Sequence, residues 1–197
     1  MTDNHHDSDS VTAARVERVE AAVIAAGLAT EAELDLVLEV LATKASPRNG
    51  ARIVARAWLD RSFAEALLAD ANAAIEKLGL SMEAGPKVRL KAVANSESVH
   101  NVVVCTLCSC YPVGLLGTPP TWYKEPAYRS RVVREPRAVL AEFGTHLPQQ
   151  TEIRVWDSSA EARYLVIPRR PEESFGLDED DLAGLVTRNG LIGTTVL

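Results

Sequence analysis

Residues 102–112 read Val-Val-Val-Cys-Thr-Leu-Cys-Ser-Cys-Tyr-Pro and contain every cysteine of this 197-residue chain, namely Cys105, Cys108 and Cys110. The three valines predict a buried strand that leads into a loop carrying all three thiols. Three cysteines cannot form a closed set of disulfides, and clustered cysteines in the cytosol more often bind a metal or carry out redox chemistry. We therefore expect the function of the protein to lie in this loop.

The spacing Cys-x-x-Cys-x-Cys leaves three kinds of site open. A structural zinc site takes about four nitrogen or sulfur ligands, so His100 or a partner residue would have to complete it. A redox Cys-x-x-Cys pair would leave the third cysteine without a role. Another transition metal would use the tight Cys108-Ser109-Cys110 spacing, because two thiolates on one ion bring the amide nitrogens of Ser109 and Cys110 close enough to ligate. Such donors suit a low-spin trivalent ion with an open sixth position, a Lewis acid towards water or a bound substrate.

The composition excludes several other classes of protein. The net charge of -6 and the lack of a basic cluster with interleaved aromatic residues argue against a nucleic-acid partner. The sequence shows no signal peptide and no apolar run long enough to span a membrane, so we expect no membrane association and a cytoplasmic location. The length suffices for one core-forming domain plus an arm.

Helical patterns dominate the N-terminal part of the chain. We expect residues 1–10 to form an unstructured tail, followed by a helix from about Val11 and a second helix opened by a capping box of Thr30 and Glu33. Both helices have narrow apolar stripes, and we expect them to pack on another chain. The turn residues at 47–50 mark a boundary between a tail and helical arm, residues 1–45, and a metal-binding catalytic domain, residues 46–197.

The rest of the chain mixes segregated helices and strands, which indicates an α+β fold. The expected helices run to Trp58, from Asp60 to Gly79, from Glu135 to Phe143 and from Asp178 to Arg188. The expected strands are Val88 to Ala94, Val102 to Val104, Ile153 to Trp156 and Arg163 to Ile167.

Further distinctive segments lie on both sides of the cysteine loop. They comprise Leu116-Gly117, Pro119 to Lys124, Tyr128 to Arg137, Ile153 to Glu161, Arg163 to Val166 and, upstream, Pro47 to Arg52 and Ala55 to Trp58. With the cysteine motif they resemble the α subunit of nitrile hydratase over roughly residues 13–195. The cysteine motif and Pro119-Pro120-Thr121-Trp122-Tyr123-Lys124 are the most specific parts of this resemblance.

The resemblance implies a helical arm followed by a layered α/β/β/α-type metal-binding domain. It implies one Co3+ per chain, ligated by Cys105, Cys108 and Cys110 and by the backbone nitrogens of Ser109 and Cys110. Thr106 resembles the cobalt type of the family, whereas the iron type carries serine there. Cys108 and Cys110 would be oxidised to sulfinic and sulfenic acids. A nitrile would bind at or beside the open position, and water or the Cys110 sulfenate oxygen would attack its carbon to give an amide.

The resemblance also implies partners. These are a β subunit, or two smaller β-like chains, and a cobalt-insertion activator protein. Arginines of the β subunit would hold the oxidised sulfurs, since outer-shell partners of a metal site usually matter.

The chain departs from the cobalt-type pattern next to the cysteines. The family usually has Trp-Pro where this chain has Val113-Gly114, and it places that tryptophan at the wall of the substrate pocket. An aromatic side chain buries about 150–250 Å², so we expect an enlarged pocket lined by Val113, Gly114, Leu115 and Trp122. We hypothesise a bulky or heteroaromatic nitrile, such as a nucleoside nitrile of the toyocamycin kind. The alternative is that a β-subunit side chain refills the space.

Two further departures precede the motif. Lys87 follows Gly85-Pro86 where the family often has glutamine, and Asn95-Ser96-Glu97 replaces an acidic-Thr-Pro turn. Both put the hydrogen bonding around the metal ligands in doubt, not the ligands themselves.

Other side chains have two interpretations each. Arg129, Arg131 and Arg137 either pair with acids of a partner or lie on a solvated helix face, and Trp122 and Tyr123 either line the pocket or pack under the loop. We expect His100 to be a hydrogen-bonded strand residue. Two other functions stay open: the metal subunit of thiocyanate hydrolase, which shares the ligand motif, and a non-catalytic subunit that binds zinc through three thiolates.

Overall fold

The computed structural model describes residues 4–82 and 88–197, apart from the side chains of residues 4–10 and 40–43. The chain divides into two compact units, Met1–Ala42 and Thr43–Leu197. No helix in these described ranges is both long and apolar enough to cross a membrane. The assignment of residues 1–45 as an arm and 46–197 as a catalytic domain stays a prediction.

The first unit is built from helix α1 (Asn4–Ala25) and most of helix α2 (Glu31–Lys44). The expected unstructured tail was wrong for residues 4–10, because α1 already begins at Asn4. The capping box is confirmed, since Thr30 N–H donates to Glu33 Oε2 at 2.8 Å and Glu33 N–H donates to Thr30 Oγ1 at 3.3 Å.

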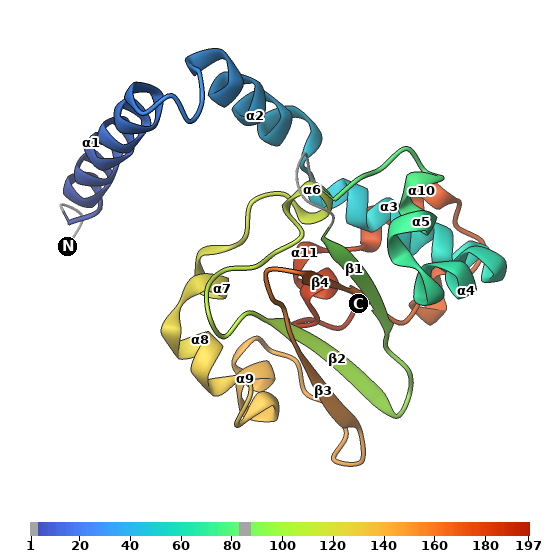
Figure 1. Cartoon of the computed structure of the whole chain (residues 1–197). Helices are drawn as coiled ribbons and strands as arrows, with labels where there is room; N and C mark the ends of the chain where they lie inside the picture. Colours follow the sequence, from blue (N-terminus) through green and yellow to red (C-terminus); the bar gives the residue numbers. More distant parts are fainter. Residues whose placement is uncertain (1–3, 83–87) are drawn as a thin grey trace. The chain divides into compact units, whose positions relative to one another are not determined.

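The second unit contains all the strands and the remaining helices of the described chain (Figure 1). Its helices are α3 (Pro47–Leu59), α4 (Arg61–Ala69), α5 (Ala71–Glu76), α6 (Val113–Leu116), α7 (Thr121–Lys124), α8 (Pro126–Arg131), α9 (Pro136–Glu142), the 3-10 turn η1 (Glu172–Ser174), α10 (Glu179–Leu185) and α11 (Arg188–Ile192). Its strands are β1 (Arg89–Ala94), β2 (Val99–Val104), β3 (Glu152–Asp157) and β4 (Ala162–Ile167).

Side-chain caps set helix boundaries that differ from those expected from the sequence pattern. The expected helix from Asp60 to Gly79 is split because the Asp70 carboxylate accepts a hydrogen bond from Ala73 N–H at 3.1 Å and starts α5 afresh. The expected last helix, Asp178 to Arg188, ends earlier, at Leu185. Thr187 Oγ1 accepts from Gly190 N–H at 3.1 Å and starts a further helix, α11, that was not expected.

The strands form two parallel pairs, β1 with β4 and β2 with β3. Helices α4 and α5 pack on β1, α11 packs on β4 and β2, and α9 packs on β3, so helices lie on both sides of the paired strands (Figure 1). The mixed architecture of helices and sheet expected from the sequence is confirmed. The register pairs Val104 at the end of β2 with Asp157 at the end of β3, which brings the cysteine loop beside the turn after β3.

Candidate metal centre

The cysteine loop leaves the buried end of β2. Val104 and Cys105 are both fully buried, whereas Cys108 is exposed and Cys110 is half-buried. The three Sγ atoms lie within 4.8 Å of one another. The Sγ atoms of Cys105 and Cys108 are 3.4 Å apart, and those of Cys108 and Cys110 are 3.1 Å apart. One side of the cluster is therefore anchored in the core while the other faces outwards.

These distances test which ion the thiols fit. Two thiolates about 2.3 Å from one ion lie about 3.3 Å apart when they subtend a right angle and about 3.8 Å apart at a tetrahedral angle. The two measured separations, 3.4 and 3.1 Å, lie on either side of the right-angle value. These two separations suit neighbouring thiolate ligands at about a right angle on one ion, so the residues present fit a single bound metal.

The thiols of Cys108 and Cys110 differ in pKa. Hydrogen bonds from the thiols of Cys110 and Cys105 lower the pKa of Cys108 to about 7, and the backbone amides of Cys110 and Ser109 add to this effect. Burial, together with the neighbouring thiols of Cys108 and Cys105, raises the pKa of Cys110 to about 12, and Arg163 opposes the rise. Of these two thiols, Cys108 therefore loses its proton at the lower pH, and the amides of Ser109 and Cys110 point towards its sulfur.

Three side chains from other elements hold the backbone of the loop. Asp157 accepts hydrogen bonds from Thr106 N–H at 2.9 Å and from Thr106 Oγ1 at 2.6 Å. Arg129 Nη1 donates to Cys108 O at 2.7 Å, and Tyr123 OH donates to Cys110 O at 3.0 Å. Sequence reasoning missed Asp157, and the only available signal was its position at the end of an expected strand.

Trp122 belongs to an aromatic cluster beneath the loop. Its ring centroid lies 4.7 Å from that of Phe143, 4.9 Å from that of Tyr128 and 6.1 Å from that of Tyr123. Tyr123 is fully buried and contacts Tyr111, with ring centroids 5.1 Å apart. Trp122 and Tyr123 were expected either to line the pocket or to pack under the loop. In the isolated chain both pack under the loop.

The expected pocket residues next to the cysteines differ in their surroundings. Leu115 is fully buried, whereas Val113 and Gly114 are half-buried. A Cβ atom at Gly114 would overlap the carbonyl oxygen of Met82 and would lie 2.9 Å from that of Ser81. The backbone at 81–82 thus occupies the space beside Gly114, so any enlargement of a pocket depends on Val113.

The three arginines, which were expected either to pair with acids of a partner or to lie on a solvated helix face, form hydrogen bonds or ion pairs within the chain. Arg131 forms ion pairs with Glu135 and Glu142, both at 2.6 Å. Arg137 donates to the carbonyl oxygens of Leu147, Pro148 and Thr151, at 3.1, 3.1 and 2.6 Å. Together with the contact between Arg129 and the cysteine loop, these bonds give all three arginines partners inside the chain, and pairing with acids of a partner subunit stays a prediction.

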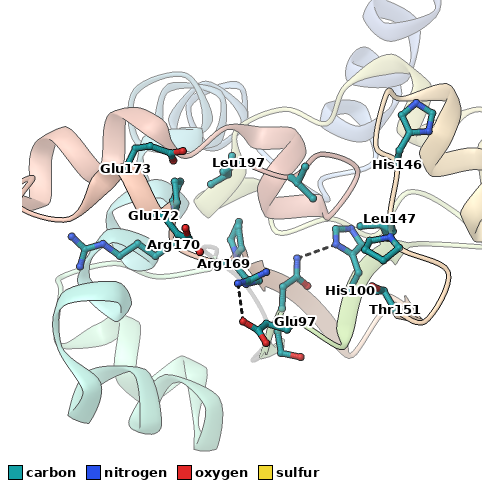
Figure 2. A pocket seen from close by; sticks show the side chains of 16 residues that line it. Glu97, His100, His146, Leu147, Thr151, Arg169, Arg170, Glu172, Glu173 and Leu197 are labelled. Atoms are coloured by element: carbon teal, nitrogen blue, oxygen red, sulfur yellow. Dashed lines mark hydrogen bonds and ion pairs between the residues drawn. The ribbon is translucent and has the colours of Figure 1, made fainter.

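His100 lies away from the thiols, in a different environment. It is 3% exposed and lines a cavity of about 350 Å³ at the start of β2, shown in Figure 2. Asn101 N–H donates to Asn95 Oδ1 at 2.8 Å, which orients the Asn95 amide so that its Nδ2 donates to His100 Nδ1 at 3.3 Å. His100 Nε2–H then donates to Gly193 O at 2.7 Å. His100 is a hydrogen-bonded strand residue, as expected, and its neutral tautomer follows from these partners.

The two departures upstream of the motif have different outcomes. Gly85-Pro86-Lys87 lies outside the described residues. Asn95 takes part in the network around His100, and Ser96 Oγ accepts from Val99 N–H at 3.0 Å. This turn therefore supports the beginning of β2, the end opposite the cysteine loop.

Comparison with known proteins identifies the family of the chain. The family model described as "Nitrile hydratase, alpha chain" matches residues 10–195. The chain belongs to the nitrile hydratase α-chain family. It is 48% identical to the low-molecular weight cobalt-containing nitrile hydratase subunit alpha of Rhodococcus rhodochrous, over 96% of this chain and 90% of that one.

Two further relatives show the breadth of this similarity. The chain is 45% identical to thiocyanate hydrolase subunit gamma of Thiobacillus thioparus, over 76% of this chain and 65% of that protein. Among solved structures, a double mutant of the Fe-type nitrile hydratase from Comamonas testosteroni Ni1 superposes with a TM-score of 0.87 at 39% identity, covering 100% of this chain and 92% of that one.

Membership of the nitrile hydratase α-chain family makes this chain an enzyme subunit that works with a β-type partner. The cysteine cluster is its candidate metal centre.

Proposed function

We propose that the chain is the metal-carrying subunit of a cobalt-type nitrile hydratase. The ligands would be the thiolates of Cys105, Cys108 and Cys110 with the backbone nitrogens of Ser109 and Cys110, and the reaction would convert a nitrile to its amide. The observation that carries the proposal is the pair of Sγ–Sγ separations, 3.4 and 3.1 Å, which suit right-angled ligand positions.

Cobalt is favoured over iron by two observations. Thr106 stands at the position where the resemblance distinguishes the cobalt type, and the relative from Rhodococcus rhodochrous is named as cobalt-containing. Bound Co3+ would supply a Lewis acid that activates water or polarises a nitrile. Structural neighbours of the iron type exist, so iron is the second candidate.

The residues around the loop would keep these donors in place. Asp157, Arg129 and Tyr123 hold the backbone at Thr106, Cys108 and Cys110, so each ligand-bearing segment has its own support. Ser109 and Cys110 turn their amides towards the Cys108 sulfur. Cys108 and Cys110, the two thiols that are not fully buried, would be the ones oxidised to sulfinic and sulfenic acids. The oxidised Cys110 and the amide of Ser109 would then lie next to the reacting nitrile.

The substrate would be a bulky or heteroaromatic nitrile. Val113 replaces a large aromatic residue of the family pattern and would leave room in the pocket, bounded by Gly114, Leu115 and Trp122. Because the backbone at 81–82 fills the space beside Gly114, the added room lies at Val113.

The active form would be an assembly in the cytoplasm. It would contain this chain and a β subunit, or two smaller β-like chains, after cobalt loading by an activator protein. Thiocyanate hydrolysis is the second candidate function, because the chain is 45% identical to a thiocyanate hydrolase subunit.

Activity assays test the proposal. The chain is co-expressed with its β partner and activator in cobalt medium, and the complex is assayed with a small aliphatic nitrile, a bulky heteroaromatic nitrile and thiocyanate. We expect amide formation with faster turnover of the bulky nitrile. Turnover of thiocyanate alone would favour the second candidate, and preference for the small nitrile would contradict the enlarged pocket.

A further inference from the structure

Arg129 approaches the cysteine loop from helix α8. The preceding residue, Tyr128, is buried and donates from its hydroxyl to Val103 O at 2.7 Å, which ties α8 to strand β2 just before the loop. Arg129 Nη1 donates to Cys108 O at 2.7 Å. Two neighbouring residues of one helix thus bind backbone oxygens of the segment that carries the thiols.

The half-buried guanidinium of Arg129 forms no ion pair with an acid in the part of the chain that the structure describes. Arg131, two residues further on, pairs with both Glu135 and Glu142 at 2.6 Å. The Nε of Arg129 is buried and has no hydrogen-bond partner among the described residues. A cation that is partly removed from water is costly unless negative charge lies close to it. Negative charge on the cysteine loop would therefore stabilise Arg129 where it lies.

The acceptor of Arg129 belongs to a peptide group that contains a proposed ligand atom. The carbonyl of Cys108 and the nitrogen of Ser109 form one planar peptide, in which resonance joins the oxygen to the nitrogen. The hydroxyl of Tyr123 donates instead to Cys110 O, and the peptide of that carbonyl contains no proposed ligand nitrogen. The contact of Arg129 thus reaches the oxygen of a peptide whose nitrogen would bind the metal.

We propose that Arg129 stabilises the Ser109 nitrogen in its metal-binding form. When this nitrogen ligates an ion, its N–H bond breaks, the proton passes to solvent, and the electron pair left on nitrogen forms the bond to the ion. Resonance moves part of the negative charge of the peptide to Cys108 O. A cationic donor binds an oxygen that carries negative charge more strongly than it binds a neutral carbonyl oxygen. The contact of Arg129 therefore strengthens as the nitrogen becomes a ligand.

The charge of the proposed ligand set also favours a cation at this position. Three thiolates and two deprotonated backbone nitrogens carry more negative charge than the positive charge of one Co3+, so the site keeps a negative charge. The carbonyl oxygen of Ser109, which shares a peptide with the Cys110 nitrogen, has no hydrogen-bond donor among the described residues. Arg129 thus acts on one of the two ligating peptides. This inference rests on the ligand set of the proposed function and adds a residue that supports it.

Cobalt release from the assembled enzyme tests the role of Arg129. Arg129→Gln removes the charge, Arg129→Lys keeps it, and Arg131→Gln removes a charge of the same helix that is paired within the chain. Because a single hydrogen bond joins Arg129 to the loop, lysine should largely replace it. We expect Arg129→Gln to lose cobalt to a chelator about tenfold faster or more, and the other two variants to stay within about threefold of the wild type.

Two results of this comparison would count against the charge of Arg129. Equal acceleration in Arg129→Gln and Arg129→Lys, or failure of both to take up cobalt, would overturn the proposal, because loss of the guanidinium shape would then explain both. Unchanged release from Arg129→Gln would also overturn it. If that variant then associated more weakly with the β subunit, Arg129 would instead pair with an acid of the partner.

Solid-state NMR of the assembled enzyme observes the peptide itself. Cys108-Ser109 is the one Cys-Ser pair of this chain, so ¹³C in cysteine carbonyls and ¹⁵N in serine give the chain one carbon–nitrogen signal. Ser109→Ala assigns this signal, because it removes the ¹⁵N label and keeps the backbone nitrogen. We expect the Ser109 nitrogen to carry no hydrogen in the cobalt enzyme. The chemical shift of the Cys108 carbonyl should change more in Arg129→Gln than in Arg129→Lys.

The outcomes of the NMR measurement separate this inference from the proposed function. A Ser109 nitrogen that keeps its hydrogen in the cobalt enzyme would overturn the proposed ligand set, and the role of Arg129 with it. Loss of that hydrogen with an unchanged Cys108 carbonyl shift in Arg129→Gln would overturn the role of Arg129 alone. A cobalt enzyme that gives both expected signals and hydrates no nitrile would remove the proposed reaction and leave the role of Arg129 standing.

Discussion

The carboxylate of Asp157 and residue Thr106 are joined by two hydrogen bonds, one to the backbone N–H at 2.9 Å and one to the hydroxyl at 2.6 Å. Thr106 follows Cys105 directly, so this pair fixes the first turn of the cysteine loop to the end of β3. The loop is thereby held from outside itself, by a residue that carries no proposed ligand atom.

Removing this support should weaken metal retention. Asp157→Ala loses both hydrogen bonds to the loop, and changes to groups that hold metal ligands typically cost about 10–100-fold in metal affinity. We expect cobalt loss to a chelator to accelerate by a similar factor, measured by elemental analysis over time. Glu161→Ala is the matched control, because Glu161 is an exposed acid after the same strand. Equal cobalt loss in both variants would show that Asp157 has no special role.

Two buried tyrosines provide a second matched comparison. Tyr123 OH donates to Cys110 O at 3.0 Å, whereas Tyr128 OH donates to Val103 O at 2.7 Å, within β2. Replacing either by phenylalanine removes one buried hydrogen bond, at a cost of about 1 kcal/mol, so both variants should unfold a few degrees earlier. Only Tyr123→Phe should also speed cobalt loss. The measurements are thermal unfolding and cobalt content, and faster loss from Tyr128→Phe would contradict the assignment.

Gly114 should not tolerate a side chain. A Cβ there meets the backbone oxygens of Met82 and Ser81, and forced repacking of this kind typically costs about 1–3 kcal/mol. Gly114→Ala should therefore lower the unfolding temperature. Gly184→Ala is the control, since a Cβ at Gly184 in α10 meets nothing within 4 Å and should be neutral or stabilising. An unchanged unfolding temperature for Gly114→Ala would show that the backbone at 81–82 shifts away from the added methyl group at little cost in stability.

Acid should destabilise the domain through His100. Burial lowers the pKa of His100 below its ordinary value, and the hydrogen bond to Gly193 O opposes this only in part. Below about pH 6.5 the unfolded chain binds a proton at His100 that the folded chain does not, so stability is present above that pH and falls as pH drops through it.

Thermal unfolding between pH 8 and pH 5 measures this effect. His100→Gln has no titrating ring, and its unfolding temperature should fall less over this range than that of the wild type. The pocket in Figure 2 also contains Glu97, His146 and Arg169, and these groups stay in both proteins, so their contribution cancels in the difference. Parallel pH profiles for the two proteins would contradict a role for His100.

The sequence predicted the features that local patterns determine. The run of valines before Cys105 is a strand, the capping box at Thr30 and Glu33 forms, and the three thiols come together because only a few bonds separate them. The break at Asp70 was missed because an exposed acid within a helical pattern looks the same whether or not its carboxylate caps a new turn.

The contacts that support the site join residues far apart in the chain. Asp157 reaches Thr106 only because β2 and β3 pair in parallel with Val104 opposite Asp157. No local sequence pattern predicts that register. The contact between Gly114 and Met82 likewise joins segments more than thirty residues apart. The expectation of an enlarged pocket treated the missing side chains at Val113-Gly114 as empty space, whereas another part of the backbone fills the space at Gly114.

The most direct test of a cobalt centre in the cysteine loop is one paired measurement on the enzyme expressed with cobalt. Elemental analysis gives the metal per chain, and mass spectrometry of the peptide that spans Cys105–Cys110 gives the oxidation state of each cysteine. We predict near-stoichiometric cobalt, with added oxygen on Cys108 and Cys110 and none on Cys105. Zinc with three unmodified thiols in the assembled enzyme would contradict the account.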